Sequence, residues 1–146
     1  MKKKDENTEV SISRRKIIGE APIVVNEITD RCLYSGFSGT LDSSRMKKII
    51  DTILEVSQRA ENDLMIIDLS NIEIIDSVIA AHLIRLNKTL QLVGLDVIFC
   101  GFQPVVAQSI VAAGVELDNI TVLKNLKRAI LEVYKRQGLK LVKEVV

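Results

Sequence analysis

Apolar residues along this chain follow two different periods, and the alternation between the two predicts the fold. Short continuous apolar runs are typical of buried strands. They lie at residues 23–28, 32–40, 64–69, 97–100 and 120–123. Apolar residues that recur every three or four positions are typical of helices. These segments run from Asp42 or Ser43 to about residue 61, and over residues 77–92, 104–113 and 126–137. Short strands joined by helices predict parallel pairing with right-handed crossovers.

The first two apolar runs are separated only by Thr29-Asp30-Arg31, which predicts an antiparallel hairpin. The sequence therefore predicts an α/β fold: a mixed, mostly parallel sheet opened by an antiparallel hairpin, with about four helices. Residues 1–20 are polar without periodicity and are expected to be disordered. Residues 21–137 are expected to form one domain. Residues 138–146 form a C-terminal tail that fits a short strand, a helix extension or a docking segment.

Composition and charge limit the classes of protein to which this chain can belong. Hydrophobic residues make up 47% of the chain and aromatic residues 3%, so the core must be aliphatic. The net charge of +1 is unevenly spread: about +3 over residues 1–16, +5 over 124–146 and −7 between them. A nucleic-acid-binding domain needs a basic face, which an acidic body does not provide. Nucleic acid is therefore not an expected partner.

Cysteine usage and the lack of long apolar runs predict a soluble, cytoplasmic protein. Cys32 and Cys100 each lie inside an apolar run without metal-binding spacing, which favours buried free thiols. The lysine-rich start is not followed by the apolar stretch of a signal peptide. No apolar run is long enough for a transmembrane helix, so stable membrane insertion is not expected.

The chain offers little for catalysis, and we expect no catalytic residue, cofactor or metal site. His82 is the only histidine, and it falls on the opposite side of the predicted helix from Ser77. A zinc site would need His82, both cysteines and a carboxylate from scattered elements. Neither GxxxxGK[ST] nor GxGxxG occurs. Asp68 ends a strand as a phosphoacceptor of a receiver domain would, but the opening hairpin does not fit that fold. Asp68 is interpreted as a turn residue.

One step in the chain remains as a candidate site. Asp76-Ser77 lies where the strand at residues 64–69 gives way to the helix at 77–92. Asp and Ser are preferred helix caps, so a purely structural role stays open. The same position exposes a hydroxyl at the positive end of a helix dipole, where an added phosphoryl group would be stabilised.

From residue 64 to about 134 the chain resembles the STAS domain family of sulfate transporters and anti-sigma factor antagonists. The residues that carry the resemblance lie at 66–70, 75–77, 92–94, 101–108 and 113–115. The resemblance implies that a serine/threonine kinase phosphorylates Ser77, with Ser109 as a secondary site. It also implies a partner surface at Asp76, Ser77 and Val78, and no enzymatic activity.

Within the family the chain looks most like the stressosome scaffold branch. Simple antagonists show Asp-Ser-Ser-Gly at this helix start, whereas Val78-Ile79 follows Ser77 here. This branch implies a switch-type kinase, related STAS proteins as partners and a homo- or hetero-oligomer. A sensor-less subunit, a fragment of a longer sensor protein and a freely diffusing antagonist of an anti-sigma factor remain alternatives. A small-molecule or nucleotide-binding STAS module is a further alternative.

Overall fold

A five-stranded sheet forms the centre of the molecule, and its strands lie in the order in which the chain makes them. The computed structural model describes residues 23–59, 61–73 and 75–145, so the expectation for residues 1–20 lies outside the described residues. The strands are β1 (Asn26–Thr29), β2 (Cys32–Ser38), β3 (Leu64–Asn71), β4 (Asp96–Cys100) and β5 (Thr121–Leu123). β1 and β2 pair antiparallel, and all other neighbours pair parallel, which confirms the predicted mixed sheet.

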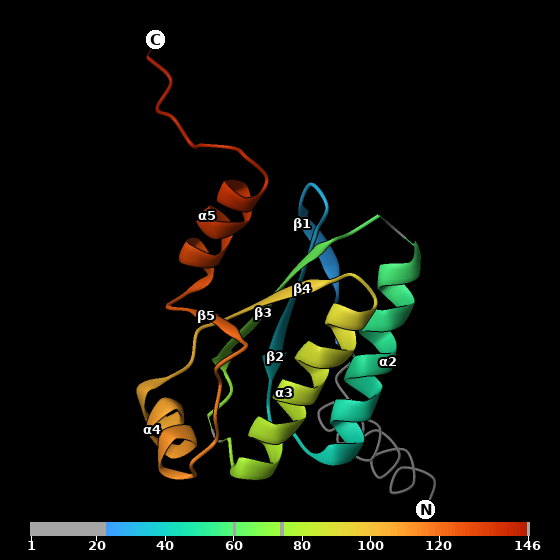
Figure 1. The fold of residues 1–146 in the computed structure, drawn as a ribbon, viewed down its shortest axis with the longest axis vertical. Coiled ribbons are helices and arrows are strands. Elements are labelled where there is room, and N and C mark those ends of the chain that lie inside the picture. Colours follow the sequence, from blue (N-terminus) through green and yellow to red (C-terminus); the bar gives the residue numbers. More distant parts are fainter. Residues whose placement is uncertain (1–22, 60, 74, 146) are drawn as a thin grey trace, which may run out of the picture.

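Helices cover both faces of the sheet (Figure 1). Among the described residues they are α2 (Ser43–Arg59), α3 (Ser77–Leu92), α4 (Pro104–Ala112) and α5 (Leu126–Arg136). α2 and α3 pack side by side on one face, α4 lies beside α3, and α5 covers the opposite face. Four helices were predicted, and α3 has the predicted bounds.

The hairpin differs from prediction at its ends. The apolar run at 23–28 was expected to be strand throughout, but β1 begins only at Asn26. Ile23 and Val25 are instead partly buried against the core, so their apolar character reflects packing outside the ladder. β2 ends at Ser38 because Gly39, with φ of 77°, turns the chain toward α2.

Alternating side chains of the strands form two separate cores. On the α2 and α3 side, Met65, Ile67 and Phe99 pack in the larger core. On the α5 side, Ile66 and Ile98 pack in a smaller one with residues of that helix. β3 is buried on both faces, which explains why its sequence is continuously apolar rather than alternating.

Three helices begin at one edge of the sheet. Because β2, β3 and β4 run parallel, their carboxyl ends meet at the lower edge in Figure 1. α2, α3 and α4 start there, at Ser43, Ser77 and Pro104. Carboxyl edges of parallel sheets are where α/β folds gather functional groups.

Both cysteines are free and fully buried, as predicted from their apolar surroundings. Burial raises the pKa of the Cys32 thiol to about 11 and, with Asp68 nearby, that of Cys100 to about 12. The protonated thiol is therefore favoured in the folded state. This stabilisation is complete below the ordinary thiol pKa and is lost as the pH rises toward 11.

We predict that a thiol reagent at pH 8 will label both cysteines far more slowly in the folded protein than in urea. Burial blocks access, and a pKa near 11 leaves only about a thousandth of the Cys32 thiol ionised at pH 8. Time-resolved absorbance with a chromogenic disulfide measures both rates. Equal rates with and without urea would contradict the buried placement.

At Gly101 the loop after β4 passes close to residues 68–70 of β3. The φ of Gly101 is 80°, and a Cβ there would lie 2.6 Å from Asp68 Oδ1 and 3.0 Å from the Ser70 backbone nitrogen. Gly94 also has positive φ, of 87°, but a Cβ at Gly94 would meet nothing within 4 Å. A substitution at Gly94 therefore introduces backbone strain alone, whereas one at Gly101 introduces both backbone strain and a steric conflict.

Gly101→Ala should lower the free energy of unfolding more than Gly94→Ala does. Both variants strain the backbone by roughly 1–2 kcal/mol, and the conflict with Asp68 and Ser70 should add about 1–3 kcal/mol at Gly101. Urea titration of the two variants beside wild type measures the difference. Equal losses would show that the loop relaxes away from β3.

Candidate functional site

The start of α3 is held by Asp76. Its Oδ1 accepts a hydrogen bond of 2.8 Å from the Ile79 backbone nitrogen, and its backbone oxygen accepts one of 3.0 Å from Ala80. Asp76 is extended, with φ of −91° and ψ of 178°, as expected of an N-cap residue. The buried side chains of Ile75 and Ile79 fix the two sides of this turn in the core.

Asp76, Ser77 and Val78 lie together on the surface, as their sequence positions predicted. Ser77 is the first residue of α3, and no hydrogen bond to its hydroxyl is found among the described residues. Val78 is 56% exposed and gives the site an apolar neighbour. The unpaired backbone N–H groups of the first helical turn make this a favourable place for an anion.

A second Asp-Ser step lies at the start of α2. Asp42 Oδ1 accepts a 2.8 Å hydrogen bond from the Arg45 backbone nitrogen, which repeats the capping geometry of Asp76. Exposed Ser43 follows Asp42 as Ser77 follows Asp76. The sequence interpretation took Asp42 or Ser43 only as the start of the helix and not as a candidate site, although Leu41-Asp42-Ser43 repeats the pattern of Ile75-Asp76-Ser77.

His82 connects the two helix starts. Its Nε2 lies 2.9 Å from Ser43 Oγ, so the side chain from α3 shares a hydrogen bond with the first residue of α2. His82 is half-buried and bonds to Ser43 rather than Ser77, which agrees with its predicted place across the helix from Ser77. Arg45 also anchors this corner, because it donates to the backbone oxygens of Ser38 and Thr40.

Asp68, predicted as a turn residue, lies instead inside β3, because the strand continues to Asn71. Its carboxylate accepts hydrogen bonds from the Tyr34 hydroxyl at 3.2 Å and from the Ser70 backbone nitrogen at 3.0 Å. Burial, followed by the charge of Asp68, raises the pKa of the Tyr34 phenol. Gln103 Nε2 donates to the Ser70 oxygen at 2.7 Å and so ties the start of α4 to β3. This network positions the loops around the site.

The structure does not link Ser109 to the Asp76-Ser77 site. Ser109 is exposed on α4, and its hydroxyl donates to the Val105 oxygen one turn back, at 2.9 Å. Such a bond is common for serine within a helix. Ser109 therefore stays a secondary prediction.

The carboxylates and the histidine at these two helix starts are engaged in caps and hydrogen bonds. The Asp76 carboxylate caps α3, and His82 bonds to Ser43. In the parts of the chain that the structure describes, no three His, Cys, Asp or Glu side chains are grouped to hold a metal ion. Within the same parts, no helix is long and apolar enough to cross a membrane.

The described residues form a small α/β domain with a mixed sheet, and comparison with known proteins gives its family. The family model of the STAS domain matches residues 24–140. The chain belongs to the STAS domain family. Among curated proteins it is similar to the RsbT co-antagonist protein RsbRA of Bacillus subtilis, with 26% identity over 135 residues. The match covers 85% of this chain and 49% of RsbRA, so the chain spans about half the length of that relative.

Solved structures share the fold. A structure of a singly substituted RsbS from Moorella thermoacetica matches with a TM-score of 0.67 and 20% identity, covering 80% of this chain and 98% of RsbS. A chain in a structure of the stressosome, described as a signal integration and transduction hub, matches with a TM-score of 0.64 and 22% identity. The match covers 80% of this chain and 98% of that chain. The anti-sigma factor antagonist SpoIIAA in its unphosphorylated form matches with a TM-score of 0.61 and 13% identity. The match covers 82% of this chain and 100% of that chain. The predicted STAS fold is confirmed.

Asp76→Ala should lower the free energy of unfolding by about 1 kcal/mol, because the Ile79 nitrogen loses its capping partner. Asp76→Asn keeps an oxygen at the same place and should cost less than about 0.5 kcal/mol. Urea unfolding followed by circular dichroism measures both. A loss that is the same for Asn and Ala would show that charge, rather than capping, is what Asp76 contributes.

Proposed function

We propose that this chain is a non-enzymatic stress-signalling STAS protein that binds a serine/threonine switch kinase and is regulated by phosphorylation of Ser77. The observation that carries the proposal is the exposed Ser77 hydroxyl, unpaired among the described residues, at the Asp76-capped start of α3. An external kinase can reach this hydroxyl, and the cap holds it in a fixed place. We place the protein in the cytoplasm.

Phosphorylation would change the charge of the partner surface without breaking the cap. A phosphoserine adds a charge of about −1.5 to −2 beside the Asp76 carboxylate. The helix dipole favours an anion there, so the modified helix stays folded. A partner that contacts Val78 and approaches the unmodified serine would meet two adjacent negative groups after phosphorylation. The contact should therefore weaken or be exchanged.

The proposed partners are related STAS proteins as well as the kinase. Similarity to an RsbT co-antagonist protein and to a stressosome chain supports a subunit of a signalling assembly. Because the chain spans about half of RsbRA, no function of the remaining half of that relative is assigned to it. A homo- or hetero-oligomer with other STAS domains is the expected state.

A freely diffusing anti-sigma factor antagonist is the second candidate, and the shared fold with SpoIIAA favours it. Light scattering after size-exclusion chromatography separates the two. Large co-assembly with related STAS proteins supports the subunit, and a small species that binds an anti-sigma factor supports the antagonist. A thermal shift with nucleotides or small anions would instead support a ligand-binding module.

Incubation with a switch-type kinase and ATP should add one phosphoryl group to Ser77. Mass spectrometry of the digested protein locates it. Ser77→Ala should lose most of the incorporation, whereas Ser109→Ala and Ser43→Ala should keep it and serve as matched serine controls. Incorporation in Ser77→Ala equal to that of wild type would refute the assignment of the site.

Phosphorylation, or its mimic Ser77→Glu, should lower affinity for the kinase by about tenfold or more. Ser77→Ala removes the hydroxyl without adding charge and should keep wild-type affinity. Calorimetry or surface plasmon resonance gives both constants. Unchanged binding by Ser77→Glu would place the kinase contact elsewhere.

A further inference from the structure

Residues 139–145 form an extended arm that leaves the domain after α5 (Figure 1). Gly138, with φ of 74°, reverses the backbone at the helix end. The Gly138 nitrogen donates to the Lys135 oxygen at 3.1 Å, and the Leu139 nitrogen donates to the Tyr134 oxygen at 2.8 Å. This pair of bonds is a Schellman motif, which fixes the direction in which the arm departs.

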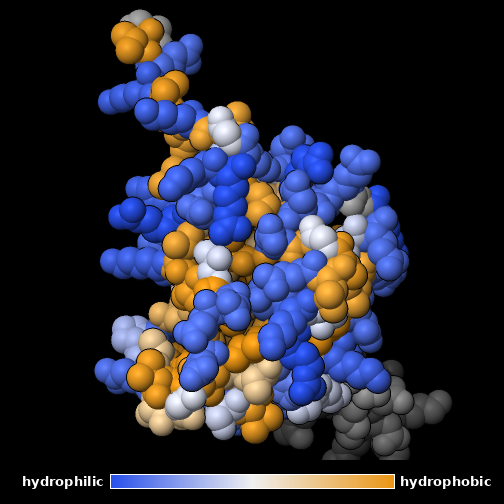
Figure 2. All heavy atoms as spheres, in the orientation of Figure 1, coloured by the Kyte–Doolittle hydropathy of each residue, from blue (hydrophilic) through white to orange (hydrophobic). Residues whose placement is uncertain are grey.

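The arm exposes apolar side chains. Leu139, Leu141, Val142 and Val145 are between 56% and 95% exposed. In the described part of the chain, residues 140–145 make no hydrogen bond with the domain. Figure 2 shows hydrophobic atoms beside hydrophilic ones on this projection. Scattered exposed apolar residues are ordinary, but four within seven residues of a projecting segment indicate a contact surface.

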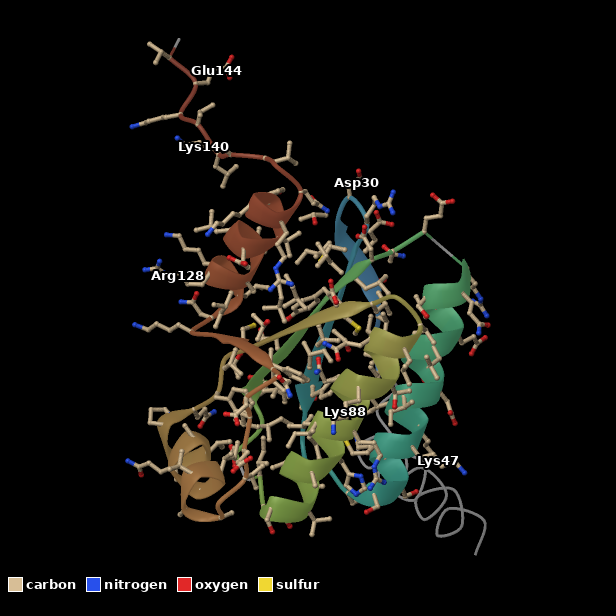
Figure 3. All side chains as sticks on the ribbon, viewed as in Figure 1. Asp30, Lys47, Lys88, Arg128, Lys140 and Glu144 are labelled. Atoms are coloured by element: carbon tan, nitrogen blue, oxygen red, sulfur yellow. The ribbon has the colours of Figure 1, made fainter. Side chains whose placement is uncertain are left out.

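A groove of about 490 Å³ lies on the other face of the sheet, between α3 and residues 116–120. Half-buried Ile84, Leu117 and Ile120 line it, together with buried Asn87, whose Nδ2 donates to the Asn119 oxygen at 3.4 Å. Exposed charged residues stand at its rim. They are Lys88, labelled in Figure 3, and Glu116 and Asp118.

Arm and groove are complementary in chemistry. The arm carries Lys140, Lys143 and Glu144 among its apolar residues, a net charge of +1. The groove combines apolar side chains with Lys88, Glu116 and Asp118, a net charge of −1. Charge is distributed in the same way along the whole chain, since residues 124–146 carry about +5 and residues 17–123 about −7. Opposite charges on two parts of one chain favour contact between copies in which the basic part meets the acidic part.

The arm of one molecule starts on the wrong side of the sheet to fill its own groove. α5 covers the face opposite to α3, and the arm continues away from the domain at the end of α5 (Figure 1). Seven extended residues span at most about 25 Å, and the sheet with its helices stands between. The occupant must therefore come from another molecule.

We propose that residues 139–145 of one copy dock into the groove between α3 and residues 116–120 of a second copy. The proposal does not depend on phosphorylation of Ser77, which lies at the other end of α3 from the rim residue Gln91. The STAS family match ends at residue 140, so the arm is mostly a feature of this chain outside the matched domain. Two copies can exchange arms in a closed dimer, or each copy can pass its arm to the next copy in a head-to-tail assembly.

Analytical ultracentrifugation of the full chain over a concentration series tests the arm. Wild type should self-associate, and a variant that lacks residues 139–146 should sediment as a monomer. Leu141→Asp with Val142→Asp should weaken association by about tenfold or more, because adjacent extended residues point to opposite sides and one must enter the groove. The matched control is Val105→Asp with Val111→Asp, two exposed valines of α4 outside the groove.

A charge swap tests the groove. Glu116→Lys with Asp118→Lys, and separately Lys140→Glu with Lys143→Glu, should each weaken self-association. Mixing the two variants should restore it, because the reversed arm then meets the reversed groove. Circular dichroism checks that each variant is folded.

Four outcomes would overturn the proposal: a monomeric wild type, a truncated variant that associates as well as wild type, no effect of reversing the groove, or no rescue on mixing. Co-sedimentation of a monomeric wild type with anionic vesicles would assign the arm to a membrane surface instead. Self-association should persist in Ser77→Ala, so a failed phosphorylation site leaves this test intact.

Discussion

Parallel pairing of β2, β3 and β4 is the constraint on which the rest of the structure depends. It aligns Ser35, Ile67 and Phe99 across three strands and buries them against α2 and α3. Because the strands run the same way, α2, α3 and α4 must all begin at one edge. Ser77, the Ser43–His82 pair and the Gln103–Ser70 bond meet there for this reason. A reversed strand would move one of these groups to the opposite end of the domain.

At the start of α3, the helix cap and the proposed phosphorylation site are adjacent but different groups. Asp76 satisfies the Ile79 nitrogen and holds the helix end in place. The Ser77 hydroxyl beside it takes no part in that bond, so its modification leaves the cap intact. The same division recurs at Asp42 and Ser43, where the hydroxyl instead contacts His82. A structural cap and an accessible hydroxyl are therefore compatible roles for one Asp-Ser step.

The domain and its arm differ in net charge and in how much apolar surface they expose. The acidic domain carries the proposed phosphorylation surface at one end of α3 and the groove along its side. The basic arm leaves from the opposite face of the sheet. The proposed kinase contact and the proposed contact between copies therefore use different surfaces, and a change in one leaves the other in place.

The sequence by itself determined the order and type of the elements, the bounds of α3, the capping residue Asp76, and the burial of both cysteines. These features follow from local period, capping chemistry and apolar runs, which neighbouring residues decide. Only the tertiary structure decided that His82 reaches Ser43, 39 residues earlier, and that Asn87 and Asp118 line one groove. It also decided that β1 starts at Asn26, because Ile23 and Val25 pack into the core instead of joining the ladder. Such contacts depend on how helices lie across the sheet, and no local pattern records that geometry.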